Sequence, residues 1–372
     1  MMRLHSMMTV AALVACSLGG SAWAQIKIGQ TAGFTGPVAA GVKEVTDGAK
    51  LFFDAVNAQG GVQGQKIELI SLDDKFDPKL SAPNAKQLID QGVLALFLTR
   101  GTPQSQTILP LLAEHKLALV APSTGAMLLH KPVNPYVFNV RATYQREAER
   151  AVQHLAGMGV KRIGLVQVDD TFGEDGATGA LKGLQGAGLT PAAHLKYPRA
   201  KPELTPLMKQ MAQADVQAVV FIGAAEAVAE GVEALRAAGS NAQLVTLSNN
   251  ASSGFIKMLK GQARGVVVSQ VFPSERSINT PLVREAQGLA KARGVELTPQ
   301  NLEGFAAAKV LVEGLKKAIK DKDLSRTGLL RALDSLGKFD LGGLEVSFSP
   351  GDHTGLDYAD VSIVGPDGKF WR

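Results

Sequence analysis

Short apolar runs rich in β-branched residues alternate with longer segments whose apolar positions recur at helical spacing. The short runs predict strands at 26–30, 67–72, 93–98, 117–120, 163–168, 192–197, 218–222, 244–247 and 266–271. The segments between them predict helices at 43–57, 80–91, 104–114, 145–157, 175–186, 203–214, 225–238 and 255–259. Strands that alternate with helices form parallel sheets with helices on both faces, so the pattern predicts an α/β protein.

The alternation stops after residue 271. The segment 281–336 is helical in pattern with almost no strand, and the chain ends in predicted strands at 344–348, 358–364 and 369–371 separated by Gly and Asp turns, where we expect a β-hairpin. A length of 372 residues with 45% hydrophobic content suits two domains, each with its own core. The two consecutive blocks of strand–helix units therefore predict two Rossmann-like lobes.

No Pro/Ser-rich linker separates the blocks, so the boundaries are predicted from breaks in the pattern. The extended stretch 134–141 is the first candidate crossing, with its hinge at 140–143, and 271–273 is the second. A third crossing is expected near 348–350. This gives lobe 1 as 25–141 and 273–348, lobe 2 as 142–272 and 349–372, and a three-stranded hinge between them.

Residues 1–24 have the pattern of a secretory signal peptide. A short positive segment precedes an apolar run over 7–18, and an Ala-Trp-Ala cleavage site ends at Ala24. The run is too short for a membrane anchor. A lipoprotein box ending at Cys16 is the alternative, but cleavage after Ala24 is favoured because Gln25 directly precedes the first strand. The sequence thus predicts export to the periplasm.

Composition argues against several kinds of chemistry. The net charge of +5 is spread along the chain, which argues against a nucleic-acid partner. Cleavage after Ala24 would leave no cysteine, and the six histidines are never paired at metal-ligand spacing. Nucleophile elbows, Walker loops and dinucleotide or zinc motifs are absent from the sequence. The acidic cluster at 169–175 is interpreted as charge at a helix start. We therefore predict no enzyme activity, no cofactor and no metal.

Two loops carry the chemistry of a ligand site. One follows the strand at 93–98 and opens a helix, with Thr102 expected as N-cap and Pro103 as the first helical residue. The next strand ends in a loop that contains Ser123, Thr124 and Gly125. Because ligands of open α/β sheets bind at the carboxyl ends of the strands, and helix starts bind anions, the pair favours a carboxylate site.

From end to end, the chain resembles the solute-binding proteins of ABC importers of the branched-chain amino acid (Leu/Ile/Val) type, which have the type I periplasmic-binding-protein fold. The segments that carry the resemblance are 33–37 (GFTGP), 57–64 (NAQGGVQG), 73–74 and 77–78 (DD and DP), 101–102 (GT), 121–124 (APST), 170–173 (DTFG) and 351–353 (GDH). The resemblance implies a ligand clamped between lobes. It also implies that Thr102 and Ser123 contact the ligand carboxylate, with Thr124 and Gly125 beside them, and that Phe172 covers the ligand.

This chain departs from the resemblance in the second lobe. Members that bind amino acids have an acidic residue in the loop after the strand at 244–247, where this chain has Asn249 and Asn250. Gly41 and Ala225 stand where bulky residues narrow the pocket. An unpaired buried ammonium is costly, so the departures favour a larger or amine-free carboxylate such as an aromatic acid. Glu226 could supply the missing charge, which leaves an amino acid open.

The resemblance and the residues together predict a monomeric, exported, non-enzymatic receptor. It would capture a small carboxylate between its lobes and deliver it to an ABC permease of the inner membrane. The alternative is a periplasmic ligand-sensing receptor component of the same fold.

Overall fold

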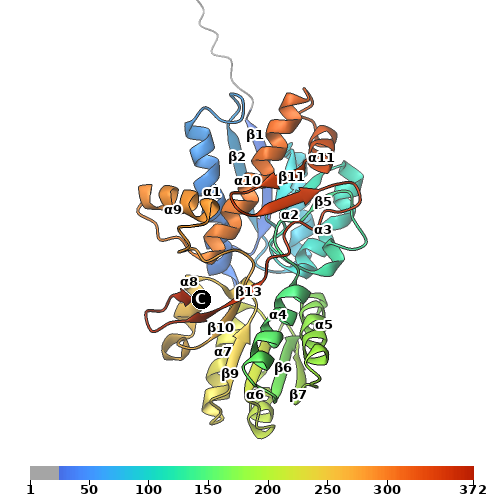
Figure 1. The fold of residues 1–372 in the computed structure, drawn as a ribbon. Coiled ribbons are helices and arrows are strands. Elements are labelled where there is room, and N and C mark those ends of the chain that lie inside the picture. The colour runs from blue at the N-terminus through green and yellow to red at the C-terminus, as the bar shows by residue number, and fades with distance from the viewer. Residues whose placement is uncertain (1–24) are drawn as a thin grey trace, which may run out of the picture.

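The computed structural model describes residues 25–372, which form two lobes joined at a narrow waist (Figure 1). The predicted signal peptide and Cys16 lie outside the described residues. Within residues 25–372, no helix has both the length and the apolar character needed to cross a membrane.

Lobe 1 is built on a five-stranded parallel sheet in the order β2-β1-β3-β4-β5. Its strands are β1 (Ile26–Ala32), β2 (Ile67–Asp73), β3 (Ala95–Phe97), β4 (Ala118–Val120) and β5 (Val137–Phe138). The helices between them are α1 (Ala39–Ala58), α2 (Pro78–Asp90), α3 (Thr102–His115) and the short η1 (Met127–Leu129).

Lobe 2 is built on a seven-stranded sheet in the order β14-β13-β10-β9-β8-β6-β7, in which only β13 and β14 run antiparallel to their neighbours. Its strands are β6 (Ile163–Val168), β7 (Ala193–Tyr197), β8 (Ala218–Ile222), β9 (Gln243–Thr246), β10 (Val267–Gln270), β13 (Asp360–Val364) and β14 (Phe370–Trp371). Its helices are α4 (Tyr144–Gly157), α5 (Thr171–Gly186), α6 (Leu204–Gln213), α7 (Ala225–Ala237), α8 (Ser253–Met258), η2 (Ser248–Asn250) and η3 (Lys260–Gln262). The β13–β14 pair is the C-terminal hairpin that the sequence predicts.

After β10 the chain returns to lobe 1, where it forms α9 (Pro281–Ala292), α10 (Pro299–Lys320), α11 (Arg326–Asp334) and the hairpin of β11 (Gly337–Asp340) and β12 (Glu345–Phe348). α10 packs closely on α1, and two glycines allow the approach. A Cβ on Gly48 would lie 2.0 Å from the Asn301 carbonyl oxygen, and one on Gly304 would lie 1.8 Å from that of Val45. This contact brings the first turns of α10 to the edge of lobe 1 that faces lobe 2.

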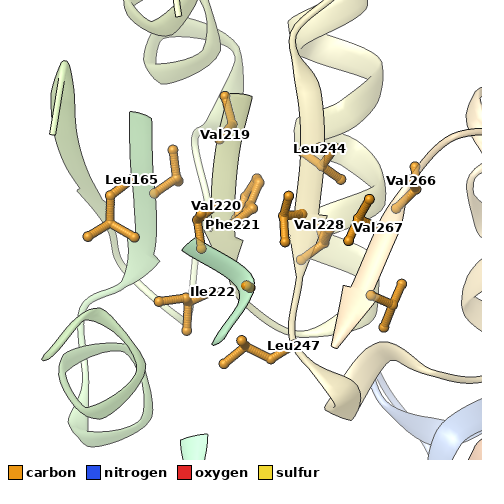
Figure 2. Packing of buried hydrophobic residues seen from close by; sticks show 14 of the residues in the cluster. Leu165, Val219, Val220, Phe221, Ile222, Val228, Leu244, Leu247, Val266 and Val267 are labelled. Carbon is orange, nitrogen blue, oxygen red and sulfur yellow. The ribbon is translucent and has the colours of Figure 1, made fainter. Parts of the chain in front are cut away.

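The hydrophobic cores confirm the predicted α/β class. Strands β6, β8 and β9 are almost completely buried, because helices cover both faces of the sheet. Figure 2 shows apolar side chains of β8, such as Val219 and Phe221, packed between neighbouring strands and the helix that carries Val228. The apolar runs at 163–168, 218–222 and 244–247 are thus the buried parallel strands β6, β8 and β9.

Three segments connect the lobes, between β5 and α4, between β10 and α9, and between β12 and β13. The third segment lies later than the predicted 348–350. His353 stacks on Phe138 of lobe 1 with ring centroids 4.1 Å apart, and its Nδ1 lies 2.9 Å from the Val137 carbonyl oxygen. The chain therefore stays with lobe 1 through His353 and crosses after it.

Candidate ligand-binding cleft

The structure brings the two predicted lobe-1 loops together. β3 and β4 are parallel neighbours, and the ladder extends past their ends through a bridge between Arg100 and Ser123. The Ser123 amide donates to the Thr99 carbonyl at 2.7 Å. Hydroxyl-bearing residues of both loops therefore meet at the carboxyl edge of the sheet, facing lobe 2.

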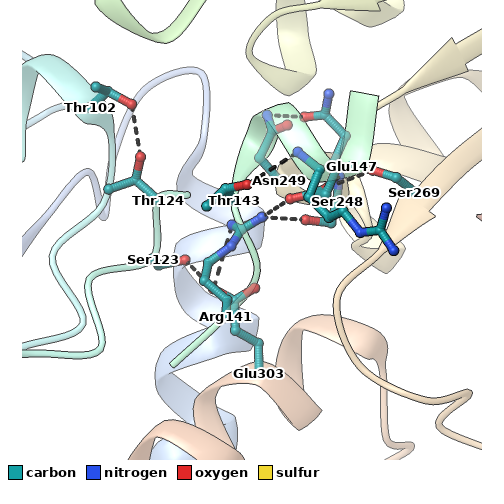
Figure 3. Close-up of polar contacts among 12 residues, drawn as sticks. Thr102, Ser123, Thr124, Arg141, Thr143, Glu147, Ser248, Asn249, Ser269 and Glu303 are labelled. Atoms are coloured by element: carbon teal, nitrogen blue, oxygen red, sulfur yellow. Dashed lines mark hydrogen bonds and ion pairs between the residues drawn. The ribbon is translucent and has the colours of Figure 1, made fainter. Parts of the chain in front are cut away.

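Thr102 is not the N-cap that the sequence predicts. α3 begins at Thr102 and Pro103 follows it, so the cap position belongs to Gly101. Gly101 has a φ of 96°, which favours glycine, and a Cβ there would lie 2.2 Å from Gln104 Oε1 and displace that side chain. The Thr102 hydroxyl is consequently not used as a cap and lies 2.8 Å from the Thr124 hydroxyl (Figure 3).

Ser123 is fully buried and joins two charged side chains. Its hydroxyl accepts from Arg100 Nη1 at 2.8 Å and donates to Glu303 Oε1 at 2.7 Å. Gly125 lies against the first crossing segment, where a Cβ would be 2.6 Å from the Ala142 carbonyl oxygen and 2.8 Å from the Tyr144 amide nitrogen. Gly125 thus packs closely against the hinge.

A buried ion-pair network at the base of the cleft was not predicted. The Arg141 guanidinium pairs with Glu147, lies 3.8 Å from Glu303 Oε1 and donates to the Ser248 hydroxyl at 2.6 Å (Figure 3). Burial disfavours the charge of Arg141, but Glu147 and Glu303 outweigh it and hold the pKa of Arg141 above its usual value. Glu147 also accepts from the Ser269 hydroxyl at 2.5 Å. The network ties the first crossing segment to both lobes.

In lobe 2, the amides of Asn249 and Asn250 point largely into their own lobe. Both donate to the Gly223 carbonyl, at 2.9 and 3.1 Å, and Asn250 also donates to the Thr246 hydroxyl at 2.8 Å. Asn249 Oδ1 has no hydrogen-bond partner among the described residues. The backbone carbonyls of Ser248 and Asn249 face lobe 1 instead, where they accept from Gln300 and Arg100.

The other lobe-2 candidates occupy helix starts. Phe172 lies in the first turn of α5, buried, with its ring 4.8 Å from that of Tyr144 in an edge-on arrangement. Ala225 is buried and Glu226 is exposed at the start of α7. Phe172 therefore packs against an aromatic residue of its own lobe.

A cavity of about 290 Å³ lies between the lobes. Lobe 1 contributes Pro37 and Phe76, and lobe 2 contributes Val168, Tyr197, Arg199, Ala200, Pro202, Ala224, Glu226, Ala227 and Glu230. The Arg199 guanidinium lies 4.8 Å from the centre of the Phe76 ring. Of the predicted site residues, only Glu226 lines this cavity. The cavity adjoins the first predicted loop, because Gln104 of α3 donates to the Phe76 carbonyl at 2.8 Å.

A larger hollow of about 910 Å³ is lined by residues of lobe 1 alone, mainly from α1, α9 and α10. It does not lie between the lobes, so a ligand there would not be clamped by both of them.

Side chains of lobe 1 donate directly to backbone groups of lobe 2. Arg100 Nη2 donates to the Asn249 carbonyl at 2.6 Å, and Gln300 Nε2 donates to the Ser248 carbonyl at 2.7 Å. At the outer edge, the Ser253 hydroxyl donates to Glu44 at 2.5 Å. Arg100 is buried, and this burial lowers the pKa of its guanidinium. Because these hydrogen bonds join the two lobes directly, the structure is a closed arrangement of the lobes.

A polar cleft between two α/β lobes that are joined by three chain segments is the arrangement of a two-lobed binding protein. The profile of the family described as "Periplasmic binding protein" matches residues 25–367, so the chain belongs to that family. Among the periplasmic binding proteins, its relatives are of type I and include Leu/Ile/Val-binding proteins.

Individual relatives agree with this placement. A substrate-binding periplasmic protein from Ralstonia solanacearum is 32% identical with a TM-score of 0.83, over 93% of this chain and 99% of that one. A possible leucine/isoleucine/valine-binding protein from Rhodopirellula baltica is 27% identical with a TM-score of 0.87, over 94% and 97%. Leu/Ile/Val-binding protein homolog 3 of Brucella melitensis is 23% identical, over 85% of this chain and 86% of its own length. The protein is thus a solute-binding protein and not an enzyme.

Proposed function

We propose that the protein is an exported receptor that captures a small carboxylate between its lobes and delivers it to an ABC import permease. The observation that carries the proposal is the group of hydroxyls of Thr102, Ser123 and Thr124 at one sheet edge, where Arg100 donates to both Ser123 and the Asn249 carbonyl of lobe 2. Hydroxyl groups and helix starts suit a carboxylate. The names of relatives such as the Brucella protein denote amino acids, which carry this group.

We propose further that the preferred ligand lacks an α-ammonium. The loop after β9 offers amides, and the two buried carboxylates of the cleft, Glu147 and Glu303, already lie within ion-pair distance of Arg141. An ammonium in a dry cleft needs a formal negative partner, and an amine-free acid does not. Glu226 on the wall of the cavity is the one predicted site residue that could serve an amino acid instead.

A thermal-shift screen over the protein amino acids, their 2-oxo acids and aromatic monocarboxylates tests the first proposal. A ligand at 100 times its Kd should stabilise the folded protein by about 2.7 kcal/mol. Calorimetry of leucine against 4-methyl-2-oxopentanoate, and of phenylalanine against phenylpyruvate, tests the second. We expect the 2-oxo acid to bind more tightly in at least one pair. A tighter amino acid in both pairs, with the preference removed by Glu226→Gln, would contradict an amine-free ligand.

Export is tested separately by the mass of the mature protein from the native host. We expect a chain that begins at Gln25. A chain that begins at a lipidated Cys16 would contradict cleavage after Ala24 while leaving the ligand proposal intact.

A further inference from the structure

Arg100 differs from every other charged group at the base of the cleft. Arg141 lies within 4.0 Å of carboxylate oxygens of both Glu147 and Glu303. Among residues 25–372, no carboxylate oxygen lies within 4.0 Å of the Arg100 guanidinium. Arg100 is nevertheless only 3% exposed. The charges of the four buried groups Arg100, Arg141, Glu147 and Glu303 sum to zero, but both carboxylates lie beside Arg141.

The groups that Arg100 does contact are neutral oxygen acceptors. Nη1 donates to the Ser123 hydroxyl at 2.8 Å and to Gln300 Oε1 at 3.2 Å, and Nη2 donates to the Asn249 carbonyl at 2.6 Å. A guanidinium presents its donors as a planar fork that matches the two oxygens of a carboxylate. A buried arginine that has only neutral acceptors lacks the partner that its geometry suits best.

One of these acceptors belongs to the opposite lobe. Asn249 lies in η2 of lobe 2, whereas Arg100 and Ser123 lie in lobe 1. When the lobes separate, the Asn249 carbonyl leaves with lobe 2, and Nη2 faces the cleft without an acceptor. The fork is then available to a ligand that arrives at the open lobe 1.

The helix opposite the guanidinium places no side chain against its donors. Gly41, near the start of α1, faces Arg100, and a Cβ there would lie 3.4 Å from Nη2 and 3.9 Å from both the Asn249 carbonyl oxygen and Gln300 Oε1. Any longer side chain at position 41 would extend toward the acceptor positions of the fork.

We propose that Arg100 is the residue that selects for the negative charge of the ligand: the carboxylate takes the place of the Asn249 carbonyl on the guanidinium, beside the hydroxyls of Ser123 and Thr102. This inference rests on the proposed function and assigns its charge recognition to one side chain. A ligand held this way is distinguished from its neutral amide by the ion pair as well as by hydrogen bonds.

The test measures charge selectivity with matched acid and amide probes. Calorimetry compares phenylacetate with phenylacetamide, 4-methylpentanoate with 4-methylpentanamide, and leucine with leucinamide, on the wild-type chain and on Arg100→Gln, Arg100→Lys and Gly41→Leu. Arg162→Gln is the control, because Arg162 is a half-exposed arginine paired with Asp215 on the surface of lobe 2. The melting temperature without ligand is recorded for every variant.

We expect the wild type and Arg162→Gln to prefer the acid over its amide. Arg100→Gln should weaken acid binding by about 10- to 100-fold, change amide binding little, and so remove most of the preference. Arg100→Lys keeps the charge and should retain part of the preference. Gly41→Leu should weaken acid binding with the charge of Arg100 and the melting temperature intact, which keeps the test valid if Arg100→Gln folds poorly.

Three results would overturn the inference. Equal losses for acid and amide in Arg100→Gln would make Arg100 a contact between lobes and not a charge selector. Unchanged acid binding in both Arg100→Gln and Gly41→Leu would show that the ligand does not bind at Arg100, while leaving the proposed function in place. If no acid binds the wild type, the proposed function itself fails, and the inference with it.

Discussion

The two walls of the cleft differ in what they present to a ligand. The lobe-1 wall presents the hydroxyls of Thr102 and Ser123 and the Arg100 guanidinium, which donates both to Ser123 and to the opposite lobe. The lobe-2 wall presents mostly backbone carbonyls, because the amides of Asn249 and Asn250 are bound to Gly223 of their own lobe. The difference suggests a division of roles, in which lobe 1 recognises the ligand and lobe 2 closes over it.

The ion-pair network that holds the two walls in place should give the largest effect. Arg141→Met would leave Glu147 and Glu303 buried without their cation, which typically costs about 3–5 kcal/mol. Urea unfolding should show this loss of stability. Arg146→Met is the control, because Arg146 is 40% exposed and pairs with Asp357 at the surface. Equal stability of the two variants would contradict a structural role for the network.

A matched pair of variants tests the division of roles between the walls. Thr102→Val should weaken binding of the best acid from the screen by about 10- to 100-fold with little loss of stability, because within residues 25–372 its hydroxyl makes a hydrogen bond only with Thr124. Asn250→Ala should do the reverse and lower the stability of the fold by about 1–2 kcal/mol, since it removes buried bonds within lobe 2. If Asn250→Ala weakens binding more than Thr102→Val, recognition belongs to lobe 2.

A contact near the waist should make stability depend on pH. Asp175 of lobe 2 accepts from the Met127 amide of lobe 1 at 3.2 Å and from Gln145 at 2.8 Å, and burial raises the pKa of its carboxyl to about 6. A raised pKa means that the folded protein binds this proton more tightly than the unfolded chain does. The contribution of Asp175 to stability is therefore most favourable below pH 4 and is lost as the pH rises to about 6.

Asp175→Asn removes this penalty. Relative to the wild type, the variant should gain nothing at pH 4 and about 1–3 kcal/mol by pH 7, as measured by urea unfolding across this range. Asp169→Asn, at an exposed position, is the control and should show no such trend. A constant difference between Asp175→Asn and the wild type from pH 4 to 7 would contradict the raised pKa.

The contact at the outer edge of the cleft should give the smallest effect. Glu44 of α1 accepts from the Ser253 hydroxyl at 2.5 Å and from the Gly254 amide at 3.1 Å, both in lobe 2. Glu44→Gln weakens bonds that exist only when the lobes are closed, so affinity for the acid should fall by a few-fold, about 3- to 10-fold. Calorimetry against Lys43→Gln, an exposed neighbour, provides the comparison. Tighter binding by Glu44→Gln would mean that this contact opposes closure.

The fold could be predicted because its signal is local. Buried parallel strands require continuous apolar runs, and β6 and β8 lie at the predicted positions within one residue. β11 was missed because it is a short edge strand with exposed residues and a Gly-Lys start. The sequence pattern predicts the third crossing too early, because the packing of His353 on Phe138 joins residues far apart in the sequence.

The polar site could be predicted only in part, because contacts between residues far apart in the sequence complete it. The sequence singles out Thr102 and Ser123 because each lies shortly after a strand, and the structure places both at the same sheet edge. Glu303 lies in a helix whose pattern predicts only an apolar face, and its contact with Arg141 depends on how α10 packs on α1. Some segments that carry the resemblance have a structural role. The Thr35 hydroxyl donates to Asp73 at 2.6 Å, which joins segment 33–37 to segment 73–74.

Small-angle X-ray scattering with and without the best acid from the screen tests the central claim, capture between the lobes, most directly. We expect a smaller radius of gyration at saturating ligand, with a scattering curve that matches the closed structure over residues 25–372, and a larger radius without ligand. A radius that stays the same while calorimetry shows the site to be saturated would contradict capture by closure of the two lobes.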